Sequence, residues 1–112
     1  MPHYLLQAAY TPEAWADLLT RPHDRIDAIR PVIEKLGGKL LHGWFAFGDY
    51  DIVAVVEMPT NIEAAAFALA GSAGGAVKAF KTTPLMTAAE GIEAMKKAAQ
   101  SGYKAPTKRA HA

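Results

Sequence analysis

Two apolar runs joined by a short turn constrain the fold more than any other part of this chain. Residues 40–47 and 50–58 are both rich in aromatic and β-branched side chains, which favour β-strands. Gly48 and Asp49 lie between the runs and have the chemistry of a two-residue hairpin turn. Such a turn fixes the register of the two strands. The expected cross-strand pairs are Phe47 with Tyr50, Phe45 with Ile52, Gly43 with Ala54, and Leu41 with Val56.

Both faces of this predicted hairpin are apolar. Successive side chains of a strand point to opposite faces, so the paired residues share one face. The other face is expected to carry Leu40, His42, Trp44, Ala46, Asp51, Val53, Val55 and Glu57. A strand pair that is apolar on both faces is usually covered on both. The helices of the chain can cover one face, and we expect a second copy of the chain to cover the other.

Strand and helix signals alternate along the rest of the sequence. The predicted elements are a strand over 4–10, a helix capped by Thr11 and interrupted at 20–22, a second helical stretch ending at Gly37, a helix over 61–73, a strand over 76–83, and a helix over 87–99. This βαββαβ order followed by a helix predicts an α+β, ferredoxin-like fold. Its antiparallel sheet would have the spatial order 4-1-3-2.

The distribution of charge divides the chain into a domain and a tail. Residues 1–95 contain 7 Lys/Arg and 11 Asp/Glu, a net charge of −4, which argues against nucleic-acid binding by the domain. Residues 96–112 contain five basic residues and no acidic residue, a net charge of +5. We expect a single domain over residues 1–100 and a flexible basic tail over residues 101–112.

The sequence also restricts the cellular environment. No apolar run approaches the ~20 residues that a membrane-spanning helix needs, and the N-terminus lacks a signal-peptide pattern. Cysteine is absent, which excludes disulfides and thiolate chemistry. We therefore expect a cytoplasmic protein that does not bind membranes.

Three short segments resemble motifs of a known family. They are Leu36-Gly-Gly-Lys-Leu40, Phe47-Gly-Asp-Tyr-Asp51 and Val56-Glu-Met-Pro59. They are similar to the GYD family of small bacterial proteins, and the resemblance covers roughly residues 1–95. It implies a ferredoxin-like unit of the dimeric α/β-barrel type, but it implies no defined activity.

Four chemically active residues are expected on the hairpin face that points away from the helices: His42, Trp44, Asp51 and Glu57. One interpretation is a small-ligand pocket inside a two-sheet barrel, where the imidazole and carboxylates handle protons. The other is a dimer interface held by histidine–carboxylate hydrogen bonds. Glu57 is the expected partner of His42. For Asp51 alone, a further interpretation is that its carboxylate ties the hairpin end to a backbone N–H.

Three aromatic residues form a second candidate group. Tyr10, Trp15 and Tyr50 could edge a cleft between the helices and the sheet, or they could be core residues with polar tips. The sequence lacks the histidine spacing of metal sites, a phosphate-binding glycine loop and a nucleophile elbow, so no metal or cofactor is expected.

These observations favour a homo-oligomer that binds a small, partly apolar molecule in a barrel or sheet–helix pocket. They define no reaction, and whether the chain is an enzyme stays open. The alternative is a non-catalytic assembly module whose polar sheet face is purely structural.

Overall fold

The computed structural model describes residues 1–106, which form one four-stranded sheet and four helices. The elements are β1 (His3–Tyr10), α1 (Pro12–Thr20), α2 (Arg25–Lys35), β2 (Lys39–Phe45), β3 (Ile52–Glu57), α3 (Asn61–Ala73), β4 (Val77–Leu85) and α4 (Ala88–Ala99). All neighbouring strands are antiparallel, in the order β2-β3-β1-β4. This topology confirms the predicted α+β, ferredoxin-like fold. The predicted tail begins at residue 101, and its part over 107–112 lies outside the described residues.

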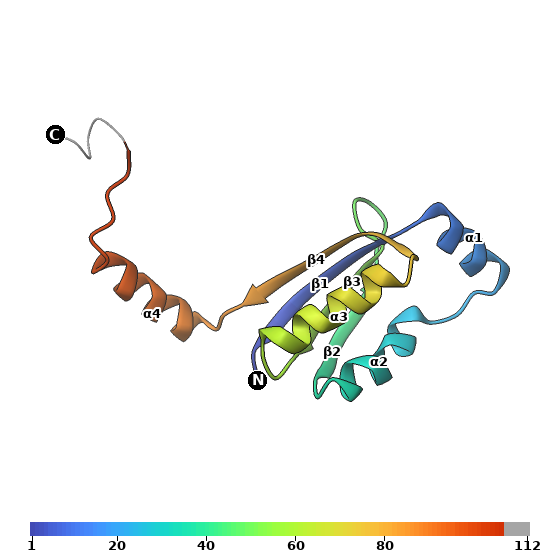
Figure 1. Ribbon diagram of the computed structural model, residues 1–112, viewed down its shortest axis with the longest axis horizontal. Helices are drawn as coiled ribbons and strands as arrows, with labels where there is room; N and C mark the ends of the chain where they lie inside the picture. The colour runs from blue at the N-terminus through green and yellow to red at the C-terminus, as the bar shows by residue number, and fades with distance from the viewer. Residues whose placement is uncertain (107–112) are drawn as a thin grey trace.

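Helices α2 and α3 cover one face of the sheet (Figure 1). The main core forms between them and that face, with Tyr4, Leu6, Ala54 and Val56 from the strands and Ile33, Ala64 and Phe67 from the helices. Burying a large apolar side chain of this kind stabilises the fold by about 1.5–3 kcal/mol. The core therefore holds both helices on the same face.

The segment between α1 and α2 follows the predicted helix break. Thr11 caps α1 by accepting a hydrogen bond from the Ala14 N–H, and α1 ends at Thr20. Asp24 caps α2, accepting from two backbone N–H groups of its first turn. Pro22 lies in the connection, which therefore has a fixed φ angle and one fewer backbone donor.

The predicted two-residue turn is wrong. Strand pairing stops at Phe45 and Ile52, and the last contact across the hairpin is a 2.8 Å hydrogen bond from the Ala46 N–H to the Asp51 carbonyl oxygen. Residues 46–51 therefore form a six-residue loop. Phe47, expected in the strand, is fully exposed in this loop.

The predicted register holds near the loop and fails at the far end of the hairpin. Phe45 pairs with Ile52 and Gly43 with Ala54, as expected, but a bulge between Leu40 and His42 places Leu40 opposite Val56. Leu40 thus lies in the core, only 5% exposed, on the face opposite to the predicted one. A bulge adds one residue to one strand, and here it lets both Leu40 and Gly43 face the helices.

Gly43 is needed at its position because α2 passes close to the sheet there. A β-carbon on Gly43 would lie 2.5 Å from Cγ2 of Ile26, closer than van der Waals contact allows. Ile26 itself packs against the core from α2. The glycine therefore determines how closely α2 approaches β2.

Helix α4 lies apart from the sheet, beyond the end of β4 (Figure 1). A capping box begins the helix: the Glu90 N–H donates to Thr87 Oγ1, and the Thr87 N–H donates to Glu90 Oε1. None of its residues is buried, and Ile92 and Met95 are 51% and 69% exposed. Within residues 1–106, no helix combines the length and apolar character that crossing a membrane requires.

Candidate functional site

His42 and Trp44 stack on the sheet face that α2 and α3 leave open, which is called the open face below. Their ring centroids lie 5.7 Å apart, with an angle of 16° between the ring planes. His42 pairs across the hairpin with Val55, and Trp44 pairs with Val53. Trp44 is 54% exposed, so an apolar indole with an imidazole beside it lies at the surface of the monomer.

Glu57 contacts His3 rather than the expected partner His42. Its Oε1 lies 3.3 Å from His3 Nε2, because β1 places His3 directly opposite Glu57. On the β2 side, Lys39 is the residue opposite Glu57. The bulge in β2 places His42 opposite Val55, and β1 places His3 opposite Glu57. The structure thus separates His42 and Glu57, which the sequence suggested as a pair.

Asp51 joins the end of β1 to helix α1. Its Oδ2 accepts hydrogen bonds from the Tyr10 N–H at 2.9 Å and from Trp15 Nε1–H at 3.2 Å. The rings of Tyr10 and Trp15 meet edge to face, with centroids 5.7 Å apart. The interpretation that this carboxylate ties the hairpin end to a backbone N–H is therefore confirmed. Tyr50, the neighbour of Asp51, is half-buried in the loop.

An apolar pocket of about 290 Å³ lies between the sheet and helices α2 and α3. Its floor is the covered face of the sheet, and its walls are aromatic and small side chains of α3 and β4. The lining residues are Leu6, Ala8, Tyr10, Arg25, Ile29, Ile52, Ala54, Phe67, Ala70, Gly71, Gly74, Ala76, Val77 and Phe80. Two of them, Phe67 and Phe80, meet edge to face with centroids 6.0 Å apart.

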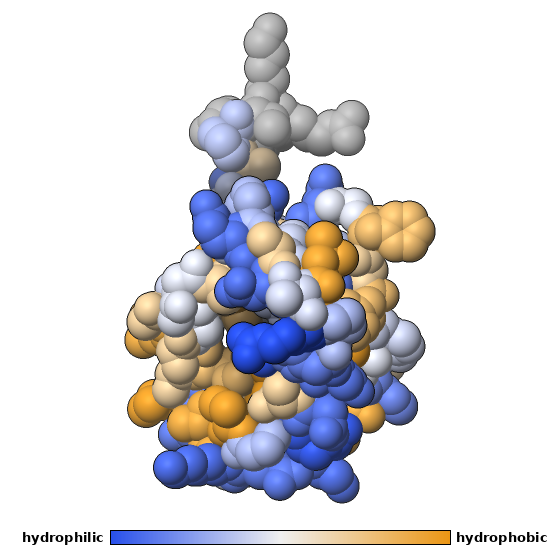
Figure 2. All heavy atoms as spheres, turned by 90° about the vertical axis from the view of Figure 1, so that its right-hand side faces the viewer, coloured by the Kyte–Doolittle hydropathy of each residue, from blue (hydrophilic) through white to orange (hydrophobic). Residues whose placement is uncertain are grey.

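A second, more polar pocket of about 500 Å³ adjoins the first at the end of β1. It is called the mouth below, and it is lined by Tyr10, Ala14, Asp17, Leu18, Arg21, Pro22, His23, Arg25 and Ala76. Three residues, Tyr10, Arg25 and Ala76, line both volumes. At this end of the molecule, hydrophobic and strongly hydrophilic side chains are exposed next to each other (Figure 2).

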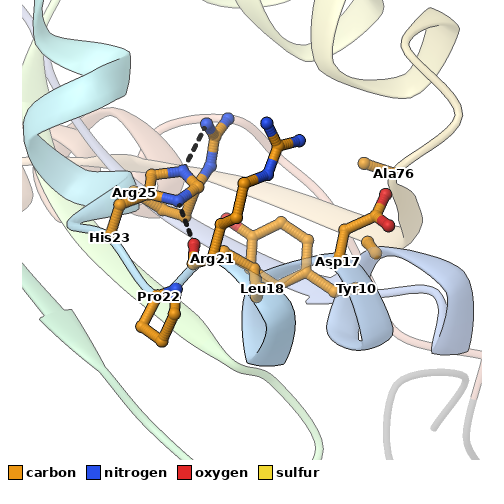
Figure 3. A pocket seen from close by; sticks show the side chains of 9 residues that line it. Tyr10, Asp17, Leu18, Arg21, Pro22, His23, Arg25 and Ala76 are labelled. Atoms are coloured by element: carbon orange, nitrogen blue, oxygen red, sulfur yellow. Dashed lines mark hydrogen bonds between the residues drawn. The ribbon is translucent and has the colours of Figure 1, made fainter.

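His23 links the two arginines of the mouth (Figure 3). Its Nδ1 lies 2.9 Å from the Arg21 carbonyl oxygen, and its Nε2 lies 3.2 Å from Arg25 Nη1. A guanidinium only donates hydrogen bonds, so Nε2 accepts and Nδ1 carries the proton that it donates to the carbonyl. Neither guanidinium lies within 4.0 Å of a carboxylate in the part of the chain that the structure describes.

The structure thus rearranges the predicted site. Tyr10 lines both pockets. Its backbone N–H donates to Asp51, and its ring meets the Trp15 ring edge to face. His42 and Trp44 remain on the open face. Among residues 1–106, no three His, Asp or Glu side chains are grouped as metal ligands.

Sequence reasoning missed Arg21 and Arg25. The signal was the charged segment 21–25 around Pro22, where we predicted only a helix interruption at residues 20–22. Phe67 and Phe80 were also missed, because an aromatic residue that lines a pocket has the same sequence pattern as one that fills a core. All four residues lie at the sheet–helix boundary.

A comparison with protein families identifies the chain. The family model described as GYD domain matches residues 4–95. The chain belongs to the GYD domain family. The matched range contains every residue that lines the pocket and the mouth. No curated protein and no solved structure matches the chain.

Proposed function

We propose that this GYD-domain protein is a homo-oligomer that binds a small, partly apolar molecule in the pocket between its sheet and its helices. The observation that carries this proposal is the apolar volume of about 290 Å³ within the sheet–helix layer. Protein interiors are close-packed, with few voids larger than a water molecule. Together with the adjoining mouth, the volume falls in the range typical of small-molecule sites, about 300–1,000 Å³.

The pocket wall has features of a binding surface. Gly71 of α3 faces the ring of Phe80, since a β-carbon at this position would lie 3.5 Å from the ring. Gly71 places no side chain over this part of the ring. Aromatic walls of this kind, with few polar groups at one end, are common in ligand pockets.

Self-association is supported by the apolar surfaces that the monomer leaves uncovered. The open face exposes Trp44, and α4 exposes Ile92 and Met95. A helix of twelve residues is only marginally stable in water unless it packs against something. The +5 charge of residues 96–112 complements the −4 charge of residues 1–95, which favours a second copy as the partner.

The alternative is an assembly module without a ligand. It is favoured by the contacts of Glu57 with His3 and of Asp51 with Tyr10, because each joins β1 to the β2–β3 hairpin, and neither carboxylate lines the pocket or the mouth. It leaves the pocket without a role. Among residues 1–106, the side-chain hydrogen bonds include no pair of a nucleophile and a base that would define a reaction.

The fluorescent apolar amine N-phenyl-1-naphthylamine tests the proposal. We expect it to bind the wild type, with fluorescence enhancement that saturates. Ala70→Leu adds bulk to a residue that lines the pocket and should abolish the enhancement. Ala65→Leu makes the same change at a position of α3 that is also exposed but does not line the pocket, and it is the matched control.

His42→Ala is a second control, because His42 is on the open face. If Ala70→Leu binds the probe as tightly as Ala65→Leu does, the pocket is not the binding site. If His42→Ala alone abolishes binding, the site lies on the open face, and the sheet–helix proposal is wrong.

A further inference from the structure

We infer that the ligand of this pocket is an amphiphilic acid, whose single anionic group is bound by Arg25 and Arg21 at the mouth. The inference rests on the proposed function and specifies the chemical class of its ligand. The apolar body of the acid occupies the sheet–helix pocket, and its carboxylate lies where the pocket meets the mouth. A simple member of this class is a medium-chain carboxylate such as octanoate.

Arg25 is in the right place to bind such a head group. It is the first residue of α2 and lines both the apolar pocket and the mouth. A molecule that fills the pocket therefore has its outer end next to this guanidinium.

The charges around the mouth favour an anion. Arg21 and Arg25 bring two guanidiniums, and Asp17 is the one carboxylate among the residues that line the mouth. Asp24, the nearest other acid in sequence, already accepts hydrogen bonds from two N–H groups of α2. A planar guanidinium without a carboxylate partner is suited to bidentate binding of a carboxylate.

His23 holds this arrangement in place. It accepts a hydrogen bond from Arg25 Nη1 and donates one to the Arg21 carbonyl, so it connects the end of α1 to the start of α2. Figure 3 shows the guanidinium groups of Arg21 and Arg25 on the same side of this connection. The Arg25 guanidinium is thus oriented before a ligand arrives, which lowers the entropy lost on binding.

The experiment compares two competitors for bound N-phenyl-1-naphthylamine: octanoate and octanol, which share a chain and differ in charge. Arg25→Gln should raise the octanoate concentration needed for half displacement by about tenfold or more, since a hydrogen bond to a charged group is worth at least that factor. The same variant should change the octanol value less than twofold. Arg21→Gln should act in the same direction.

Arg30→Gln is the matched control, because Arg30 lies on α2, pairs with Asp27 and does not line either pocket. It should leave the concentrations of octanoate and octanol needed for half displacement unchanged. Probe binding by Arg25→Gln itself shows that the variant is folded. If Arg30→Gln weakens the binding of octanoate as much as Arg25→Gln does, the loss of overall positive charge explains the effect and the inference is wrong.

The two proposals fail in different ways. If Ala70→Leu blocks the probe but Arg25→Gln affects octanoate and octanol equally, the pocket is real and its acid specificity is not. If Ala70→Leu does not block the probe, the proposed function fails before the charge question arises.

Discussion

The two faces of the sheet are built from similar residues but have different surroundings. On the covered face, Leu6 is 4% exposed and Val56 is completely buried, while on the open face Trp44 is 54% exposed. Strand alternation makes both faces apolar, and α2 and α3 cover one of them. The comparison shows that apolar strand residues alone do not define a core. The covered face carries the core and the pocket, whereas the open face carries the surface that we propose a second copy covers.

The largest expected effect is a difference in stability between alanine variants of two neighbouring leucines, one on each face. Leu6→Ala on the covered face should destabilise the protein by about 2–5 kcal/mol, because it leaves a cavity in the core. Leu5→Ala removes the same atoms from the open face, where Leu5 is only half-buried in the monomer. Chemical denaturation of both variants measures the difference.

The concentration dependence of Leu5→Ala sharpens this test. If a second copy covers the open face, the stability lost in Leu5→Ala should grow with protein concentration, since dissociation is then linked to unfolding. Equal losses for both variants at every concentration would contradict the distinction between the faces.

Trp44→Glu should have the next largest effect, and it should act on assembly rather than folding. A carboxylate on the open face would be buried unpaired against a second copy, which costs several kcal/mol. In the monomer the side chain is exposed to water and the fold should persist. Light scattering should show a monomer, with an unchanged circular dichroism spectrum.

Phe47→Glu is the matched control for Trp44→Glu, because Phe47 is fully exposed in the loop rather than on the sheet face. It should leave the assembly intact. A wild type that is monomeric at micromolar concentration would refute the homo-oligomer altogether.

The order of elements could be predicted because its signals are local. Thr11 before Pro12 and Thr87 before Glu90 mark helix starts that the structure confirms. The sheet order follows from the sequence of strands and helices. By contrast, the register at Leu40 depends on contacts that are distant in sequence. The bulge after Leu40 lets this side chain pack in the core beside Val56, while Gly43 still faces α2. Alternation within a strand does not reveal such an insertion.

The candidate site could be predicted only in part, for the same reason. Tyr10 was predicted, with Trp15 and Tyr50, as an aromatic residue that could edge a cleft between the helices and the sheet, and the structure brings Tyr10 to both pockets. Arg21 and Arg25 acquire their position from the path between α1 and α2, which is set by packing against the sheet. The sequence therefore indicates that a charged segment exists, but only the fold places it at the entrance of an apolar pocket.

The smallest expected effect concerns α4, whose N-terminus is held by its cap rather than by burial. The Thr87 backbone N–H, which donates to Glu90 Oε1 at 2.9 Å, lowers the pKa of this carboxyl below its usual value. Because the folded pKa is depressed, the stabilisation is fully present above the unfolded pKa of about 4.3 and is lost as pH falls through the folded pKa.

Backbone chemical shifts of residues 88–91, recorded from about pH 6 to about pH 2, should therefore lose helical character at the acidic end. Glu90→Ala should remove this dependence on pH, whereas Glu93→Ala, which breaks only an exposed pair with Lys96, should retain it. An unchanged acid transition in Glu90→Ala would assign the effect to another group and leave the cap without a role in holding α4.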